Sequence, residues 1–84
     1  MAFIRSPNEL ALIVLSQRKK QGLSQLEVGK LVGLTQKTIS GFENKPESTQ
    51  LETLFRILSA LNLDVKICSK IGVENEASEW KNEW

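Results

Sequence analysis

Apolar residues recur every three or four positions in two long stretches of the chain, which predicts two helices that face a core. The first stretch follows SPNE at residues 6–9, where Ser6 can cap a helix, the proline suits its first turn and Glu9 can bond back to the cap. It ends at the basic run from Arg18 to Lys20, before Gly22. The second stretch follows TQLE at residues 49–52, where we expect Thr49 to form another capping box. Its predicted core stripe consists of Leu51, Leu54, Phe55, Leu58 and Leu61.

Between these stretches, residues 25–43 predict two short helices joined by a tight turn. Gly29 falls inside the first short helix, where glycine costs about 1 kcal/mol relative to alanine and is tolerated if a second helix crosses close by. Gly33 suits the left-handed residue that ends a helix, and Thr35 then suits the cap of the next one. Ile39 and Phe42 are three residues apart, so they share a face that can pack inward.

The opposite face of the second short helix is polar and carries no acidic residue, since it consists of Gln36, Lys37, Ser40 and Gly41. Two helices joined by a short turn that contains glycine form a helix-turn-helix unit, whose second helix enters the major groove of DNA. Gln36 is then a candidate for bidentate recognition of adenine, and Ser40 can contact either kind of base. Lys37 could donate to guanine or contact phosphate. Three further residues are expected to bond phosphate or, for the threonines, to cap the helix: Thr35, Thr38 and Lys45.

The period of the pattern changes to two at LDVKIC, residues 63–68, which predicts a single β-strand in an otherwise helical chain. A lone strand leaves backbone groups unpaired, and a second copy of the same strand could satisfy them. In an antiparallel pair centred on Val65, Asp64 faces Lys66 of the other chain, and Leu63 and Ile67 join Val65 on the buried face. We therefore expect a two-fold dimer, although the strand could also lie against its own domain.

Length and charge divide the chain into a body and a tail. The 84 residues are enough for one domain, predicted at 1–62, with the dimerising strand at 63–69 and a flexible acidic tail at 70–84. Residues 1–70 hold ten Lys and Arg against six Asp and Glu, a net +4, whereas residues 71–84 hold one Lys against four Glu, a net −3. A basic body suits contact with phosphate. Trp80 and Trp84 are large side chains that suit a binding surface for a partner, although the tail could also fold back onto its own domain or be an extension without function.

Several classes of chemistry are not expected from this composition. The chain has no histidine and one cysteine, Cys68, so it offers neither a zinc site nor an internal disulfide, and we expect no cofactor. No nucleophile stands beside a base, and an enzyme is not expected. The absence of a membrane-spanning run or a signal peptide leads us to expect a cytoplasmic protein.

The helix-turn-helix stretch resembles the Cro/repressor (XRE-type) family, whose spacing is matched by Gln25, Gly29, Gly33 and Ile39. That resemblance implies that Gln25 contacts the DNA backbone and braces the second helix. It also implies that Arg18 supports the DNA-facing surface, beside its other interpretation as a cation at a helix end. Taken over the whole chain, SPNEL, ISGFEN, TLFRILSALNLDVKIC and the final Glu83-Trp84 resemble the HipB-type antitoxins.

The HipB-type resemblance implies a dimer with an intersubunit β-lid, a palindromic operator in its own operon, and a HipA-type serine/threonine kinase toxin as partner. By resemblance, Trp84 docks on the toxin with help from Trp80. The expected function is thus an antitoxin and transcriptional autorepressor. Two alternatives share the helix-turn-helix unit: a stand-alone repressor without a toxin, and a module in which the unit packs on a protein partner.

Overall fold

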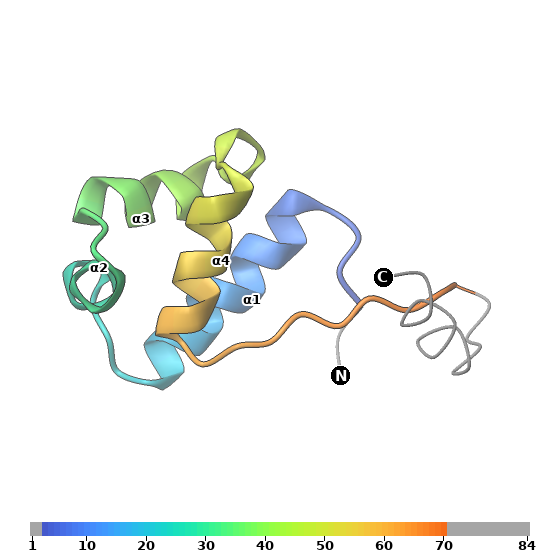
Figure 1. Ribbon diagram of the computed structural model, residues 1–84, viewed down its shortest axis with the longest axis horizontal. Helices are drawn as coiled ribbons and strands as arrows, with labels where there is room; N and C mark the ends of the chain where they lie inside the picture. The colour runs from blue at the N-terminus through green and yellow to red at the C-terminus, as the bar shows by residue number, and fades with distance from the viewer. Residues whose placement is uncertain (1–2, 71–84) are drawn as a thin grey trace.

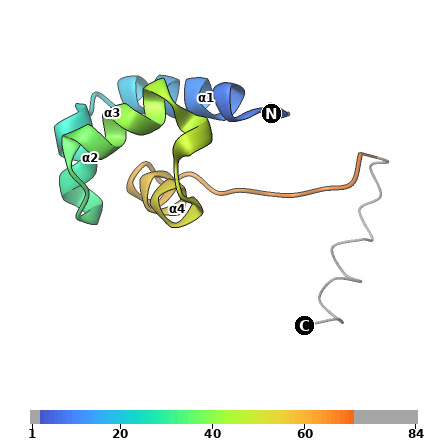
Figure 2. The same ribbon diagram turned by 90° about the horizontal axis from the view of Figure 1, so that it is seen from above.

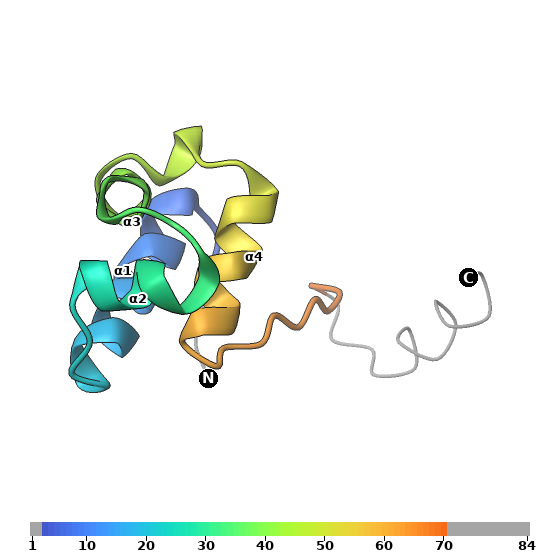
Figure 3. The same cartoon turned by 60° about the vertical axis from the view of Figure 1, so that its left-hand side comes forward.

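The computed structural model describes residues 3–70 and contains four α-helices and one short 3-10 helix in that range (Figure 1). The helices are α1 (Pro7–Lys20), α2 (Gln25–Val32), α3 (Gln36–Asn44) and α4 (Leu51–Ala60), and the 3-10 helix η1 (Pro46–Ser48) joins α3 to α4. The predicted helical, helix-turn-helix architecture is confirmed. Helix α3 lies beside α2 on the outside of the molecule, away from the segment that follows α4 (Figures 1 and 3).

Two predicted helix starts use serine caps. Ser24 accepts from the Glu27 N–H at 3.0 Å while the Glu27 carboxylate accepts from the Ser24 N–H at 2.9 Å. These bonds, chiefly the one from the Ser24 backbone, lower the pKa of the Glu27 carboxyl. Ser6 caps α1 by accepting from the Glu9 N–H, but the prediction for Glu9 was wrong in detail, because its carboxylate accepts from the Arg5 N–H rather than from the cap.

The predicted third capping box is also wrong. The cap of α4 is Gln50, which makes no side-chain cap hydrogen bond. Thr49 stands one residue too early, because its backbone N–H donates to the Pro46 carbonyl at 3.1 Å and closes η1. Thr49 therefore belongs to the turn that links α3 to α4 and does not serve as the cap of α4 that the local sequence predicted.

The core consists of side chains from all four helices and the residue after α4, and its buried apolar members are Ala11, Val14, Val28, Ile39, Phe42, Ile57, Leu58 and Leu61. Ile39 and Phe42 face inward, as predicted. The predicted stripe on α4 was misplaced, because Leu51 is 70% exposed and Phe55 is 55% exposed, whereas Ile57, which the prediction omitted, is only 1% exposed. Helix α4 turns the edge with Ile57 and Leu58 toward the core, so Leu51 and Phe55 lie at the outer border of its apolar arc.

Two glycines of the helix-turn-helix unit are there for different reasons. A Cβ on Gly29 would collide with the backbone carbonyl of Leu34, in the turn that leads to α3. Gly33 ends α2 with φ 71°, in the left-handed region that glycine adopts without a steric cost. Gly41, on the outer face of α3, has open space where a Cβ would stand.

After α4, Asn62 takes a left-handed conformation with φ 61°, and the chain then leaves the helices as an extended segment (Figure 2). No β-strand is formed within residues 3–70, so the expected strand at 63–69 is not found in the single chain. Val65 is 53% exposed and Ile67 is 80% exposed. These apolar side chains therefore lack the cover that a partner for the strand would provide.

The contrast between Gly29 and Gly41 gives a stability test. We expect Gly29→Val to lower the free energy of unfolding by about 2–3 kcal/mol, because the backbone of the turn must move to admit the side chain. Gly41→Ala should raise it by about 0.5–1 kcal/mol, because alanine is the better helix former and meets no neighbour. Chemical unfolding followed by circular dichroism measures both, and equal effects of the two substitutions would contradict this account of the fold.

Candidate nucleic-acid interface

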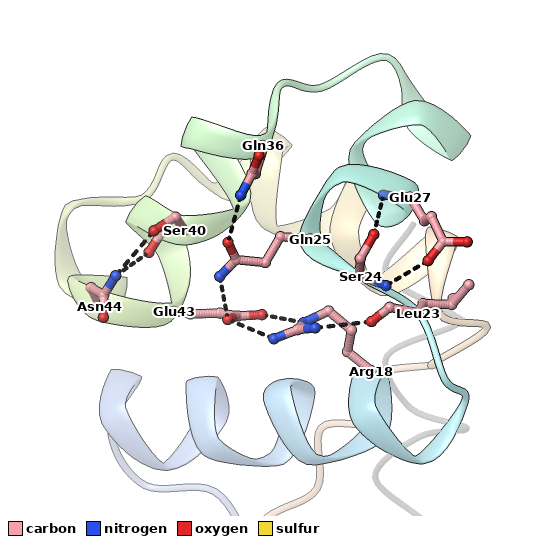
Figure 4. Close-up of polar contacts among 9 residues, drawn as sticks. All are labelled: Arg18, Leu23, Ser24, Gln25, Glu27, Gln36, Ser40, Glu43 and Asn44. Carbon is pink, nitrogen blue, oxygen red and sulfur yellow. Dashed lines mark hydrogen bonds and ion pairs between the residues drawn. The ribbon is translucent and has the colours of Figure 1, made fainter.

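A largely buried ion pair joins α1 to α3. Arg18 Nε lies 2.7 Å from Glu43 Oε2, and Arg18 Nη2 donates to Glu43 Oε1 at 3.1 Å, so the pair is bidentate (Figure 4). The two side chains are only 11% and 7% exposed, respectively. Arg18 Nη1 also donates to the Leu23 carbonyl at 2.9 Å, which ties the turn between α1 and α2 to the same guanidinium.

The ion pair extends into a chain of amides that reaches the outer surface of α3. Gln25 Nε2 donates to Glu43 Oε1 at 2.8 Å, and Gln36 Nε2 approaches Gln25 Oε1 at 3.5 Å (Figure 4). Because a carboxylate only accepts, the Gln25 amide must turn its nitrogen toward Glu43 and its oxygen toward Gln36. The last contact is long for a hydrogen bond, so Gln36 is guided toward one side without being held firmly.

Glu43 is the residue of this network that the sequence analysis did not select. An acidic side chain in the last turn of a helix is unfavourable beside the negative end of the helix dipole, and it therefore indicates that a specific cation lies close by. Helix α3 has no basic residue in its last turn, so that cation had to come from another helix. The cation is Arg18, which lies behind the outer surface and not on it.

The polar side of α3 faces away from the core. Gln36, Lys37 and Gly41 are exposed and Ser40 is half-buried, while the acidic Glu43 is turned inward. Thr35 is the helix cap, accepting from the Thr38 N–H at 3.2 Å, and the two threonine hydroxyls lie 3.0 Å apart. Both threonines are thus engaged at the start of the helix, where the backbone N–H groups and the dipole favour an anion.

The remaining selected residues lie at the edges of this surface or outside it. Lys45 follows α3 with an exposed side chain, and its N–H donates to the Gly41 carbonyl at 2.8 Å. Leu63 is half-buried, and the next four residues of the expected dimer surface are exposed: Asp64, Val65, Lys66 and Ile67. Trp80 and Trp84 fall outside the described residues.

Two other kinds of feature are absent from the described residues. Residues 3–70 contain no group of three or more His, Cys, Asp or Glu side chains that could hold a metal ion. Within the same range, none of the helices combines the length and the apolar character that crossing a membrane requires.

The buried ion pair predicts a large effect of its acidic member on stability. Glu43→Ala leaves a buried guanidinium without its partner, so we expect the free energy of unfolding to fall by about 3 kcal/mol. Glu47→Ala is the matched control, since this exposed carboxylate should change stability by less than about 0.5 kcal/mol. The double variant Arg18→Met with Glu43→Leu should recover most of the loss, because it removes both charges together. Equal thermal midpoints for Glu43→Ala and Glu47→Ala would show that the Arg18–Glu43 pair does not support the fold.

Comparison with known proteins agrees with this geometry. Residues 14–67 match the helix-turn-helix family. The chain is 40% identical to the antitoxin HipB of Escherichia coli (strain K12) over 82 residues. The aligned region covers 96% of this chain and 93% of HipB.

Solved structures give the same result. The chain is similar to HipB chains in a HipA-HipB-O2-O3 complex and in a HipB-O4 20mer complex, each with a TM-score of 0.81 and 40% identity, over 83% of this chain and 99% of the other. Because both the family match and the likeness to HipB extend well beyond the two short helices, the chain belongs to the helix-turn-helix family and, within it, to the HipB-type antitoxins.

Proposed function

We propose that this protein is an antitoxin that represses its own operon by binding a palindromic operator as a dimer, and that it binds and neutralises a HipA-type serine/threonine kinase toxin. The observation that carries the DNA-binding half is the outward polar side of α3, supported from behind by the buried Arg18–Glu43 pair. The relatives in complexes with HipA and with the O4 20mer correspond to the two halves of the proposal.

Base recognition is assigned to the exposed residues of α3. Gln36 has an amide of the right shape to bond adenine N6 and N7 together, and its weak contact with Gln25 lets it turn toward a base without the loss of a strong bond. Ser40 lies one turn further along the same side. Lys37 is exposed and can reach either guanine or the phosphate backbone.

Backbone contacts set the position of α3 in the groove. Thr35, Thr38 and the N-terminus of α3 offer hydroxyls and N–H groups at one edge, and Lys45 offers an ammonium group at the other. Gln25 stands in the first turn of α2 and supports Gln36 through its amide oxygen. The small exposure of Arg18 supports a role in positioning α2 and α3, with no direct contact to DNA.

Dimerisation is assigned to the segment after α4. Its alternating pattern and its exposed Val65 and Ile67 suit an antiparallel strand pair with a second copy, and Leu51 and Phe55 provide further uncovered apolar surface on α4. A domain of this size buries only about 60% of its unfolded surface, so a shared core would add needed stability. A two-fold pair would hold its recognition helices about 34 Å apart, which suits a palindromic operator.

Contact with the toxin is assigned to the acidic tail at 70–84, with Trp84 as the main anchor and Trp80 as its helper. The support for this part is the likeness to HipB over almost the whole chain, together with the enrichment of tryptophan at binding hot spots. A DNA-binding antitoxin of this kind would work in the cytoplasm, in association with the nucleoid.

The base-reading role of Gln36 predicts a local change in sequence preference. Gln36→Ala should lower operator affinity by about 1–3 kcal/mol at one position of each half-site and leave the other positions unchanged. Fluorescence anisotropy with operator variants measures this preference.

The phosphate contacts predict a dependence on salt. The logarithm of affinity should fall with the logarithm of salt concentration, with a slope near −0.9 per phosphate contact. If no duplex binds at low salt, the chain is instead a protein-interaction module.

The proposed strand pair predicts the mass in solution. The full-length chain should have the mass of a dimer by light scattering at micromolar concentration. Val65→Asp should shift it to the monomer, because two carboxylates would meet at the centre of the antiparallel pair. Ser16→Asp on the exposed side of α1 serves as a control for added charge. A native monomer would refute the dimer.

The tail assignment predicts a separation of the two activities. Trp84→Ala should lose capture of a HipA-type kinase in a pull-down while operator affinity stays the same, because the tail lies apart from α3 in the sequence. If Trp84→Ala captures the kinase as well as the native chain does, the tail has no such role.

A further inference from the structure

Asn44, the last residue of α3, folds back over Ser40 (Figure 4). Its Nδ2 lies 3.0 Å from the Ser40 backbone oxygen and 3.1 Å from Ser40 Oγ. A carbonyl oxygen accepts and never donates, so the atom that faces it must be the amide nitrogen. The direction of the Asn44 amide is thereby determined, with Oδ1 on the side away from the Ser40 carbonyl.

The same contact determines the direction of the Ser40 hydroxyl. An amide nitrogen has hydrogens to give and accepts none, so Ser40 Oγ accepts from Asn44 and keeps its own hydrogen free. Within residues 3–70, no hydrogen bond uses that hydroxyl hydrogen and none reaches Asn44 Oδ1. The two side chains therefore present one donor and one acceptor next to each other.

We propose that Ser40 and Asn44 act as one unit that reads a single adenine in the major groove. The Ser40 hydroxyl donates to adenine N7, and Asn44 Oδ1 accepts from the N6 amino group. Adenine is the base whose major-groove edge places one acceptor beside one donor, whereas guanine shows two acceptors, cytosine an amino donor, and thymine an acceptor and a methyl group. This inference rests on the proposed DNA-binding function and adds to it a reading residue, Asn44, and a base for Ser40.

The location of the pair suits this role. Gln36, Ser40 and Asn44 are spaced four apart along α3, so they lie on one side of the helix and would meet successive parts of the groove. Gly41 lies between Ser40 and Asn44 in the sequence, on the outer side of α3. The space where its Cβ would stand is open, which lets the helix approach the base edges closely. Asn44 is exposed and Ser40 is half-buried, so neither is needed to fill the core.

The test is selection of binding sites by the full-length protein from a library of randomised duplexes, followed by affinities for the selected site with each base pair at each position. Asn44→Ala and Ser40→Ala should each lose the preference for adenine at the same position of the half-site, by roughly tenfold. The double variant should lose no more than either single variant, because the two side chains form one reading unit.

Asn44→Asp is the decisive variant. A carboxylate has no hydrogen to donate, so it loses the bond to the Ser40 carbonyl, and the bond that it can keep is one donated by the Ser40 hydroxyl. The unit then offers only acceptors. The preferred base at that one position should change from adenine to cytosine, whose N4 amino group donates. The added negative charge weakens all duplexes alike and cancels in the ratio between bases. Lys45→Ala is the matched control, with a uniform loss and no change of preference.

The outcomes separate this inference from the function on which it rests. If the native protein selects no sequence, the proposed function fails. If it selects one and Gln36→Ala alters it, but the Asn44 variants keep the native preference at every position, the function stands and the Ser40–Asn44 unit is refuted. Changes at two different positions for Ser40→Ala and Asn44→Ala would also refute it. Thermal midpoints show whether Asn44 serves only to end the helix, because that role would change stability without any change in base preference.

Discussion

The bidentate contact between Arg18 and Glu43 is the interaction on which the rest of this molecule depends. It joins residues 25 positions apart and connects α1 to the end of α3, while the same guanidinium bonds the turn that leads into α2. A buried charge pair adds little to stability compared with apolar side chains of the same size, but the loss of one member is costly. Its value here is geometric, because it sets how three helices meet at one point.

That geometry matters because base recognition depends on small differences in direction. The carboxylate of Glu43 forces the Gln25 amide into one orientation, and the Gln25 oxygen in turn faces Gln36. The order of donors and acceptors is thus transmitted from a buried charge to an exposed side chain. At the other end of α3, Asn44 imposes a direction on Ser40 in the same manner. At each end of the proposed reading surface there is therefore an amide whose nitrogen and oxygen cannot be exchanged, although its contact with Gln36 is weak and its contact with Ser40 is firm.

The apolar surface that remains uncovered is the other main feature of the single chain. Eight buried apolar side chains form its core. Of the exposed large apolar side chains, Leu51, Phe55, Val65 and Ile67 belong to the C-terminal part of the described chain, and others lie on the N-terminal segment, α1 and α2. These four side chains lie on α4 and on the extended segment that follows it, which runs away from the helices (Figure 2). The proposed dimer would cover this surface and leave both reading helices free, which is why the two roles do not compete.

The sequence by itself determined the features that arise from short-range physics. The cap at Ser24, the left-handed Gly33, the inward Ile39 and Phe42 and the polar outer side of α3 follow from residues within one or two turns of each other. The tertiary structure alone decided the Arg18–Glu43–Gln25 network, the early use of Thr49 in η1 and the exposure of Leu51 and Phe55. These depend on how the helices cross and on how the connection between α3 and α4 closes. Local periodicity contains no information on either, because it describes which side of a helix is apolar and not how much of that side a small core can cover.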